Sequence, residues 1–253
     1  MRSAKCEVRS SIAHPAPRTT HVALVCRVIM RIGVMGGTFD PIHLGHLRAA
    51  EEIYWAFKLD RVIFVPAAQP PHKEEQIEAS ALHRYEMVSL ATVSTPYFSV
   101  SPIEFSRPGR SYSVETVREF RRLFGQECAL YFIMGVDAFL DIATWREARE
   151  LLALAQVIVT ARPGWRLDEV ERSMSPAQHH ALGGPRFKYL RISEITSQMA
   201  MHSYEPRLIL LVEVVSLDIS SSEIRQLVKE GRSVRHLVTD AVAAYMATHG
   251  LYQ

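Results

Sequence analysis

The residues of this chain best suited to chemistry are glycines and histidines at a predicted strand-to-helix junction. The stretch reads Gly36-Gly37-Thr38-Phe39-Asp40-Pro41-Ile42-His43-Leu44-Gly45-His46. Glycines let the backbone approach an anion closely, and a helix N-terminus offers unpaired N–H groups and the positive end of its dipole. His43 and His46 are three residues apart, so both rings can lie on one helix face and donate to phosphate oxygens. A Gly-Gly turn or a single histidine is weak evidence, but the combination favours a phosphate site.

A second anion-binding pattern lies near the C-terminus, at Ile219-Ser220-Ser221 followed by Arg225. Serines at a helix start cap N–H groups and can donate to an anion. Arg225, one turn further on, can form paired hydrogen bonds with phosphate oxygens. Taken alone, this segment predicts an ordinary capped helix.

The elements that must position these residues alternate between strand and helix patterns. Strands are expected at 31–35, 61–65, 98–101, 129–134, 156–160 and 207–215, and helices at 47–57, 81–93, 113–124, 146–154, 167–174, 220–231 and 238–248. Ser113 is the predicted N-cap of its helix, and 163–206 reads as an irregular excursion containing one helix. The alternation predicts an α/β fold, an open parallel sheet with helices on both faces. Ligands of such sheets bind at the carboxyl ends of the strands, where Gly135 and Asp137 are also expected.

Length and composition limit the function classes. The chain has 253 residues, 48% of them hydrophobic, which suffices for one domain with an appended subdomain. No apolar run approaches a membrane span, so no membrane partner is expected. Three scattered cysteines fit a reducing, cytoplasmic setting better than a disulfide framework or a zinc cluster. The oligomeric state is left open, a homo-oligomer included.

Residues 1–30 differ in kind from the rest of the chain. Their five basic residues against one acid give them a net charge of +4, so the remainder carries −2 of the total +2. The mildly acidic body gives no support for nucleic-acid binding. Met30 stands directly before the first predicted strand, and we expect 1–30 to be a non-essential extension. The alternative is that 22–29 forms an extra strand or lengthens the first.

The two anion-binding patterns resemble signatures of the nucleotidylyltransferase superfamily, His-x-Gly-His and Ile-Ser-Ser-x-x-x-Arg. Further segments resemble bacterial nicotinate-nucleotide adenylyltransferases in the order expected, although Ser113 stands where those enzymes usually have Thr. These segments are Pro66-Ala67-Ala68-Gln69-Pro70-Pro71-His72-Lys73, His83-Arg84-Tyr85-Glu86-Met87, Arg110-Ser111-Tyr112-Ser113-Val114-Glu115-Thr116, Gly135-Val136-Asp137, Trp145 and Arg162-Pro163-Gly164. The resemblance runs from about 31 to 252, is weakest over 165–206 and is absent over 1–30.

The resemblance implies an enzyme of NAD biosynthesis that transfers the adenylyl group of ATP to nicotinate mononucleotide, releasing pyrophosphate. Its catalytic residues would be His43, His46 and Arg225. The residues implied for ATP are Gly36, Gly37, Thr38, Phe39, His43, His46, Gly135, Asp137, Ile219, Ser220, Ser221 and Arg225. Those implied for nicotinate mononucleotide are Thr38, Lys73, Arg84, Tyr112, Ser113 and Trp145. Mg²⁺ would be bound mainly through the substrate phosphates, without a protein metal cluster.

The resemblance also implies a Rossmann-like α/β domain over 31–215 and a C-terminal helical part, 216–253, that completes the ATP phosphate site. Within the same superfamily, a pantetheine-phosphate adenylyltransferase or a cytidylyltransferase would share both phosphate motifs, but not Pro-Pro-His-Lys and Trp145 together. A class I aminoacyl-tRNA synthetase would need a Lys-Met-Ser-Lys-Ser-like loop and an anticodon domain. A dinucleotide-binding oxidoreductase would need Gly-x-Gly-x-x-Gly. A catalytically dead nucleotide sensor is disfavoured by the intact histidines and Arg225.

Overall fold

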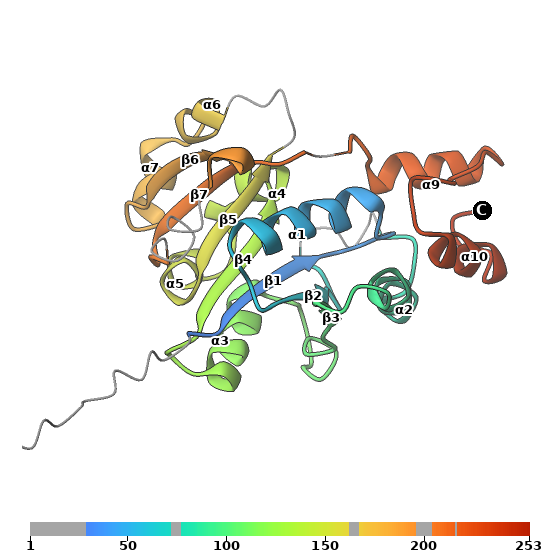
Figure 1. The fold of residues 1–253 in the computed structure, drawn as a ribbon, viewed down its shortest axis with the longest axis horizontal. Helices are drawn as coiled ribbons and strands as arrows, with labels where there is room; N and C mark the ends of the chain where they lie inside the picture. The colour runs from blue at the N-terminus through green and yellow to red at the C-terminus, as the bar shows by residue number, and fades with distance from the viewer. Residues whose placement is uncertain (1–28, 72–76, 162–166, 196–203, 216) are drawn as a thin grey trace, which may run out of the picture.

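In the part of the chain that the structure describes, seven parallel strands form a single sheet in the order β3-β2-β1-β4-β5-β7-β6 (Figure 1). The computed structural model describes residues 29–71, 77–161, 167–195, 204–215 and 217–253. The strands are β1 Arg31–Gly37, β2 Arg61–Pro66, β3 Phe98–Val100, β4 Ala129–Gly135, β5 Gln156–Ala161, β6 Arg186–Arg191 and β7 Leu208–Glu213. The chain adds β2 and β3 outward from β1 on one side, and β5, then the edge strand β6, on the other side of β4, with β7 inserted between β5 and β6. The strand order therefore reverses between β1 and β4, where open α/β sheets form a crevice for ligands.

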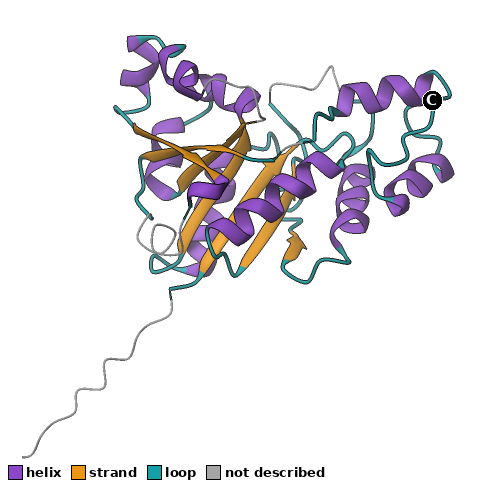
Figure 2. Cartoon of the chain, turned by 45° about the horizontal axis from the view of Figure 1, so that its top comes forward, coloured by secondary structure: helices purple, strands orange, loops and turns teal. Residues whose placement is uncertain are grey.

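Helices cover both faces of the sheet (Figure 2). The α-helices are α1 Leu44–Ala56, α2 Ala81–Thr92, α3 Ser113–Phe124, α4 Val136–Leu140, α5 Ala148–Leu154, α6 Leu167–Arg172, α7 Pro176–Ala181, α9 Ser221–Lys229 and α10 Asp240–Thr248, and the 3-10 turns are η2 Ile142–Thr144 and η3 Ile192–Glu194. One apolar core contains residues of α1, α2, α9 and α10, and the other contains residues of α3, α4, α5 and α6. The predicted α/β fold with a two-sided parallel sheet is confirmed.

The strand sequences supply both cores because successive side chains point to opposite faces. In β4, Tyr131 and Ile133 join the core beneath α1, whereas Leu130, Phe132 and Met134 join the core beneath α3. A strand buried on both sides is mainly apolar, which is why β1, β2, β4 and β5 could be read from the sequence as nearly continuous apolar runs.

The predicted boundaries differ from the structure where capping or exposure decides them. Helix α1 begins at Leu44 rather than 47, because the chain turns into the helix at His43 and the Leu44 N–H donates to the Leu237 carbonyl oxygen. Ser113 is not the N-cap of α3: Tyr112 holds that position and its carbonyl oxygen accepts from Glu115 and Thr116. The first turn of α3 is therefore satisfied by main chain rather than by a serine side chain.

The region predicted as irregular contains more structure than one helix. Helix α6 ends at Arg172, two residues before the predicted end, and α7 and β6 were not predicted. Strand β6 has one buried residue, Leu190, so it lacks the apolar run that marks the inner strands. Helix α7 did carry a signal, since Ser175 and Gln178 form a capping box with Pro176 at the helix start.

The C-terminal helices lie at one end of the sheet, beyond the arrowhead of β1 in Figure 1, with α10 packed against α2. Helix α9 begins one residue after its predicted start, behind Ser220, and α10 begins at Asp240 behind Thr239. The division of the chain at 215/216 into two functional parts stays a prediction. Residues 1–28 lie outside the described residues, and so does all but Ile29 of the alternative strand at 22–29; Ile29 is not part of β1, which begins at Arg31.

Candidate active site

The start of the turn after β1 leaves no room for a side chain at Gly37. A Cβ atom on Gly37 would lie 2.8 Å from the ring of Phe39, closer than carbon atoms pack. Phe39 itself has a φ of 52° and is buried, so its ring is folded back under the turn. The glycine pair therefore lets the chain leave the sheet abruptly and brings main-chain N–H groups to the carboxyl end of β1.

The two histidines lie together at the start of α1, as their spacing predicts. Their rings stack with centroids 3.6 Å apart and an interplanar angle of 23°. The His43 main-chain N–H donates to Nδ1 of His46 (3.3 Å), and the edge of Phe39 contacts the His46 ring at 5.1 Å. Because Nδ1 of His46 is an acceptor in this contact, a neutral ring carries its proton on Nε2. His46 is thus oriented as a hydrogen-bond donor through Nε2.

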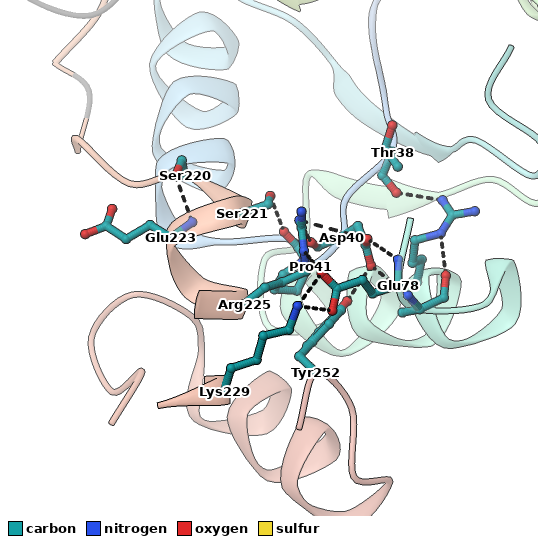
Figure 3. A network of polar contacts seen from close by, with 12 residues as sticks. Thr38, Asp40, Pro41, Glu78, Ser220, Ser221, Glu223, Arg225, Lys229 and Tyr252 are labelled. Carbon is teal, nitrogen blue, oxygen red and sulfur yellow. Dashed lines mark hydrogen bonds and ion pairs between the residues drawn. The ribbon is translucent and has the colours of Figure 1, made fainter. Parts of the chain in front are cut away.

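The second predicted motif, at the start of α9, lies against the first, the turn after β1 (Figure 3). Ser220 caps α9, its Oγ accepting from the N–H of Glu223 at 3.1 Å. Ser221 Oγ donates to the Pro41 carbonyl oxygen at 2.9 Å, and Arg225 Nη1 donates to the Asp40 carbonyl oxygen at 2.8 Å. Residues about 180 positions apart thereby form one site, with the N-termini of α1 and α9 both at its wall.

A buried carboxylate that the sequence interpretation did not single out connects these parts. Asp40 is 4% exposed. Its carboxylate accepts hydrogen bonds from the N–H groups of Glu78 and Ala79 and from the Tyr252 hydroxyl, the last at 2.6 Å. It also forms an ion pair with Arg225 at 4.0 Å. Glu78 in turn accepts from Nε of Arg225 and from Lys229, each at 3.0 Å. The Lys229 ammonium and the Arg225 guanidinium hold the pKa of Glu78 below its ordinary value against the opposing effect of burial.

A pocket of about 620 Å³ opens at the carboxyl ends of β1, β4 and β5. Every residue predicted for ATP lines it: Gly36, Gly37, Thr38, Phe39, His43, His46, Gly135, Asp137, Ile219, Ser220, Ser221 and Arg225. Gly135 lies at an exposed position where an added Cβ would meet nothing within 4 Å. The lining also includes apolar residues, among them Val136, Ala138, Ala161 and Val214. Two helix N-termini with histidine and arginine, together with apolar surface, suit an anionic nucleotide.

A larger hollow of about 950 Å³ lies beside α6, α7 and β6. It contains none of the predicted site residues, and its walls include Arg149, Arg172 and His179. It lies away from the point of strand reversal, so volume alone does not identify the site, and the chemistry of the lining residues favours the smaller pocket.

The residues predicted for the second substrate are placed differently. Arg84 is 1% exposed and donates to three carbonyl oxygens, those of Thr38 (2.7 Å), Ala79 (3.2 Å) and Ala68 (3.4 Å). Burial lowers the pKa of Arg84, and the nearby Asp40 carboxylate opposes that shift. In this structure Arg84 supports the turn that carries Thr38, and its predicted contact with a mononucleotide stays a prediction.

Tyr112 and Trp145 do not line the 620 Å³ pocket, and neither does Ser113. Both rings pack against the core under α3 and α5; the Arg146 guanidinium lies 4.7 Å above Tyr112, and Trp145 meets Phe132 edge-on. Gln69 and Ser111 form two mutual hydrogen bonds, at 2.8 and 3.0 Å, which join the proline-rich loop to the segment before α3. Lys73 lies outside the described residues, as do His72 and 162–166.

Comparison with known proteins places this arrangement in a family. A cytidylyltransferase-like family model matches residues 34–227. A probable nicotinate-nucleotide adenylyltransferase of Moorella thermoacetica is 43% identical over 223 residues, covering 88% of this chain and 92% of the relative. The chain belongs to the nicotinate-nucleotide adenylyltransferase family. A family member from Thermus thermophilus, also named as probable, is 43% identical over 224 residues, covering 88% of this chain and all of the relative.

Solved structures agree with the family at the level of the fold. A Plasmodium falciparum nicotinic acid mononucleotide adenylyltransferase complexed with NaAD superposes with a TM-score of 0.64 at 16% identity, covering 88% of this chain and 97% of the other. At this identity the likeness shows the fold alone. Within the residues described, no helix combines the length and the apolar character needed to cross a membrane, and no group of three or more His, Cys, Asp or Glu residues is placed to hold a metal ion.

Proposed function

We propose that the chain transfers the adenylyl group of ATP to nicotinate mononucleotide, giving nicotinate adenine dinucleotide and pyrophosphate as a step of NAD biosynthesis. Relatives 43% identical over most of the chain carry the name of this activity. The P. falciparum enzyme of the same fold is described as complexed with NaAD, the product that this reaction would give.

The observation that carries the proposal is the meeting of two distant anion-binding segments in one pocket. The turn after β1 supplies glycine N–H groups and two histidines, while the start of α9 supplies serines and Arg225. The contacts of Ser221 with Pro41 and of Arg225 with Asp40 hold the two segments together. A triphosphate needs positive charge and donors along its whole length, and this arrangement offers them from two sides.

The chemistry requires no nucleophile from the protein, because the phosphate of the mononucleotide is the attacking group. Its oxygen would form a bond to the α-phosphorus of ATP while the bond to pyrophosphate breaks. The protein's task is to hold the two anions in line and to stabilise the charge that develops on the α-phosphate and the leaving group. His43, His46 and Arg225 are placed to do so, and Gly135 and Asp137 are proposed to contact adenosine.

His46 is the residue proposed to contribute most in the transition state. Its ring is held between Phe39 and His43, and its Nδ1 is occupied by the His43 N–H. The Nε2–H donor is therefore fixed before substrate binds, so it costs no reorganisation when charge develops. Arg225 is similarly held, by Glu78 and by the Asp40 carbonyl oxygen.

The carboxylates near the turn after β1 and the start of α9 are largely engaged by protein groups, so Mg²⁺ would be held mainly by the substrate phosphates. Asp40 is occupied by main-chain N–H groups and the Tyr252 hydroxyl, and Glu78 by Arg225 and Lys229. Asp137 is the carboxylate of the pocket that stays exposed. Mg²⁺, when bound through the triphosphate, would neutralise phosphate charge and keep most of its waters.

The acceptor is proposed to be the acid rather than the amide. In the segment before α3, Arg110 stands two residues before Tyr112, and no carboxylate is adjacent to Tyr112 in sequence. A carboxylate on the pyridine ring gains a charge-assisted hydrogen bond in such surroundings that an amide does not. We expect nicotinate mononucleotide to exceed nicotinamide mononucleotide by at least ~10-fold in kcat/KM.

The test is a product assay with purified full-length protein. ATP is offered with nicotinate mononucleotide, nicotinamide mononucleotide or phosphopantetheine, and CTP replaces ATP as a control for the nucleotide. Equal amounts of dinucleotide and pyrophosphate from ATP and nicotinate mononucleotide support the proposal. Product from phosphopantetheine, or from CTP in preference to ATP, would contradict it, whereas equal kcat/KM for the two pyridine nucleotides would overturn only the preference for the acid.

A further inference from the structure

The side chain of Tyr252, the residue before the C-terminus, lies beneath the phosphate-binding turn. It is 5% exposed, and its backbone lies in the left-handed region with a φ of 65°. Its hydroxyl donates to Oδ1 of Asp40 at 2.6 Å (Figure 3). Burial, and after it the hydrogen bond to Asp40, raise the pKa of Tyr252 far above its ordinary value, so the hydroxyl remains a donor throughout the neutral range.

The Asp40 carboxylate lies where it could compete with a nucleotide for Arg225. Its Oδ2 is 4.0 Å from Nη1 of Arg225, at the limit of an ion pair, while the same Nη1 donates to the Asp40 carbonyl oxygen at 2.8 Å. The carboxylate is held back by three other donors, the N–H groups of Glu78 and Ala79 and the Tyr252 hydroxyl. Two of the three are main-chain groups, so Tyr252 is the donor that a side-chain change removes.

Arg225 is positioned with capacity left for an anion. In the contacts drawn in Figure 3, Nε of Arg225 donates to Glu78 and Nη1 donates to the Asp40 carbonyl oxygen. Arg225 also lines the 620 Å³ pocket. When a buried carboxylate loses a hydrogen-bond donor, a shift toward another donor lowers its free energy, because a buried charge with too few partners is destabilising. Among the described residues, Arg225 is the cation that forms an ion pair with Asp40, whereas Arg84, also nearby, is held by three carbonyl oxygens.

We propose that Tyr252 is a positioning residue for ATP: by donating to Asp40, its hydroxyl keeps that carboxylate from capturing Arg225 and so leaves the guanidinium for the triphosphate. The inference rests on the proposed function, in which Arg225 binds phosphate. It assigns to the C-terminal end of the chain a part in substrate binding that acts through two other residues.

The test compares Tyr252→Phe with wild type in the ATP and nicotinate mononucleotide assay. The ring is kept, so packing changes little, while the donor is lost. KM for ATP is expected to rise about 10-fold, the factor that corresponds to ~1.4 kcal/mol, with kcat within about 2-fold of wild type. Tyr245→Phe is the matched control: it removes a tyrosine hydroxyl that pairs with His83 between α10 and α2, and KM for ATP should not change.

A double-mutant cycle separates this role from a general structural one. In an Arg225→Ala background, Tyr252→Phe should have no further effect on the affinity for an ATP analogue measured by calorimetry, because the residue through which it acts is gone. The same factor in both backgrounds, an unchanged KM in Tyr252→Phe, or a lower melting temperature as its sole effect would each overturn the inference. A wild-type protein that makes no dinucleotide from these substrates would instead contradict the proposed function.

Discussion

Replacing His46 by Ala should lower kcat strongly and the free energy of unfolding only moderately. The substitution removes an Nε2–H donor that is fixed before substrate binds, and loss of one such donor lowers kcat by ~10²–10³, about 2.7–4 kcal/mol of transition-state stabilisation. It also removes the acceptor for the His43 N–H and the ring contacts with Phe39 and His43. Those contacts are worth about 1–2 kcal/mol of folding free energy.

Two polar substitutions sharpen this prediction because they place the amide at different ring positions. In His46→Gln the side-chain nitrogen can take the place of Nε2, whereas in His46→Asn the amide reaches only the position of Nδ1. The Asn variant can accept from the His43 N–H but cannot donate at the far side of the ring. We therefore expect His46→Gln to keep roughly 10-fold more kcat than His46→Asn, although both should unfold at similar urea concentrations.

The assay is steady-state dinucleotide formation at saturating ATP and nicotinate mononucleotide, with urea unfolding measured in parallel on the same preparations. A near-normal kcat in His46→Ala would remove this histidine from the mechanism. Equal kcat in the Gln and Asn variants would refute the assignment of the donor to Nε2. A loss of kcat that tracks the loss of folding free energy across the three variants would refute the catalytic role in favour of a structural one.

Three further outcomes follow from the structure and a fourth from the sequence. Gly37→Ala should lose both stability and activity because its Cβ would overlap an aromatic ring, whereas Gly135→Ala should unfold like wild type in urea yet bind an ATP analogue more weakly in calorimetry. Arg84→Met should lower the free energy of unfolding by about 3 kcal/mol or more, since three carbonyl oxygens lose their donor. Because the pKa of Glu78 is lowered in the folded protein, its ion pairs stabilise the fold at pH values above its ordinary pKa, and this stabilisation is lost as the pH falls through the lowered pKa. Glu78→Gln should therefore reduce the free energy of unfolding, measured in urea, at pH 7 and reduce it progressively less toward pH 3. A chain beginning at Met30 should fold and match the full-length kcat, and loss of soluble expression on truncation would show that the extension is needed.

The parts of the site that depend on local sequence could be predicted, and the parts that depend on distant contacts could not. The two histidines and the serine cap of α9 lie within short stretches whose residue types specify a helix start. The network around Asp40 joins residues 38 and 212 positions away, and nothing near Tyr252 in the sequence indicates a partner for its hydroxyl. The available signal was that Asp40 is the one acidic residue in the stretch 36–46.

The fold shows the same division. Inner strands such as β4 are apolar at every position because both faces are covered, and they were predicted nearly to their ends. Strand β6 lies at the sheet edge with one buried residue, so its pattern resembles that of a loop. Arg84 was assigned to substrate from its place in a motif, yet its carbonyl partners belong to three separate segments that meet only in the folded chain.

The stereochemical course at phosphorus tests the central claim most directly. The account holds that the mononucleotide phosphate attacks the α-phosphorus of ATP in line, with no group of the protein bonded to the adenylyl moiety. With the α-thio analogue of ATP of one configuration and nicotinate mononucleotide, the dinucleotide should form with inversion at phosphorus. Retention would require two successive displacements through an adenylylated residue, and it would contradict the account.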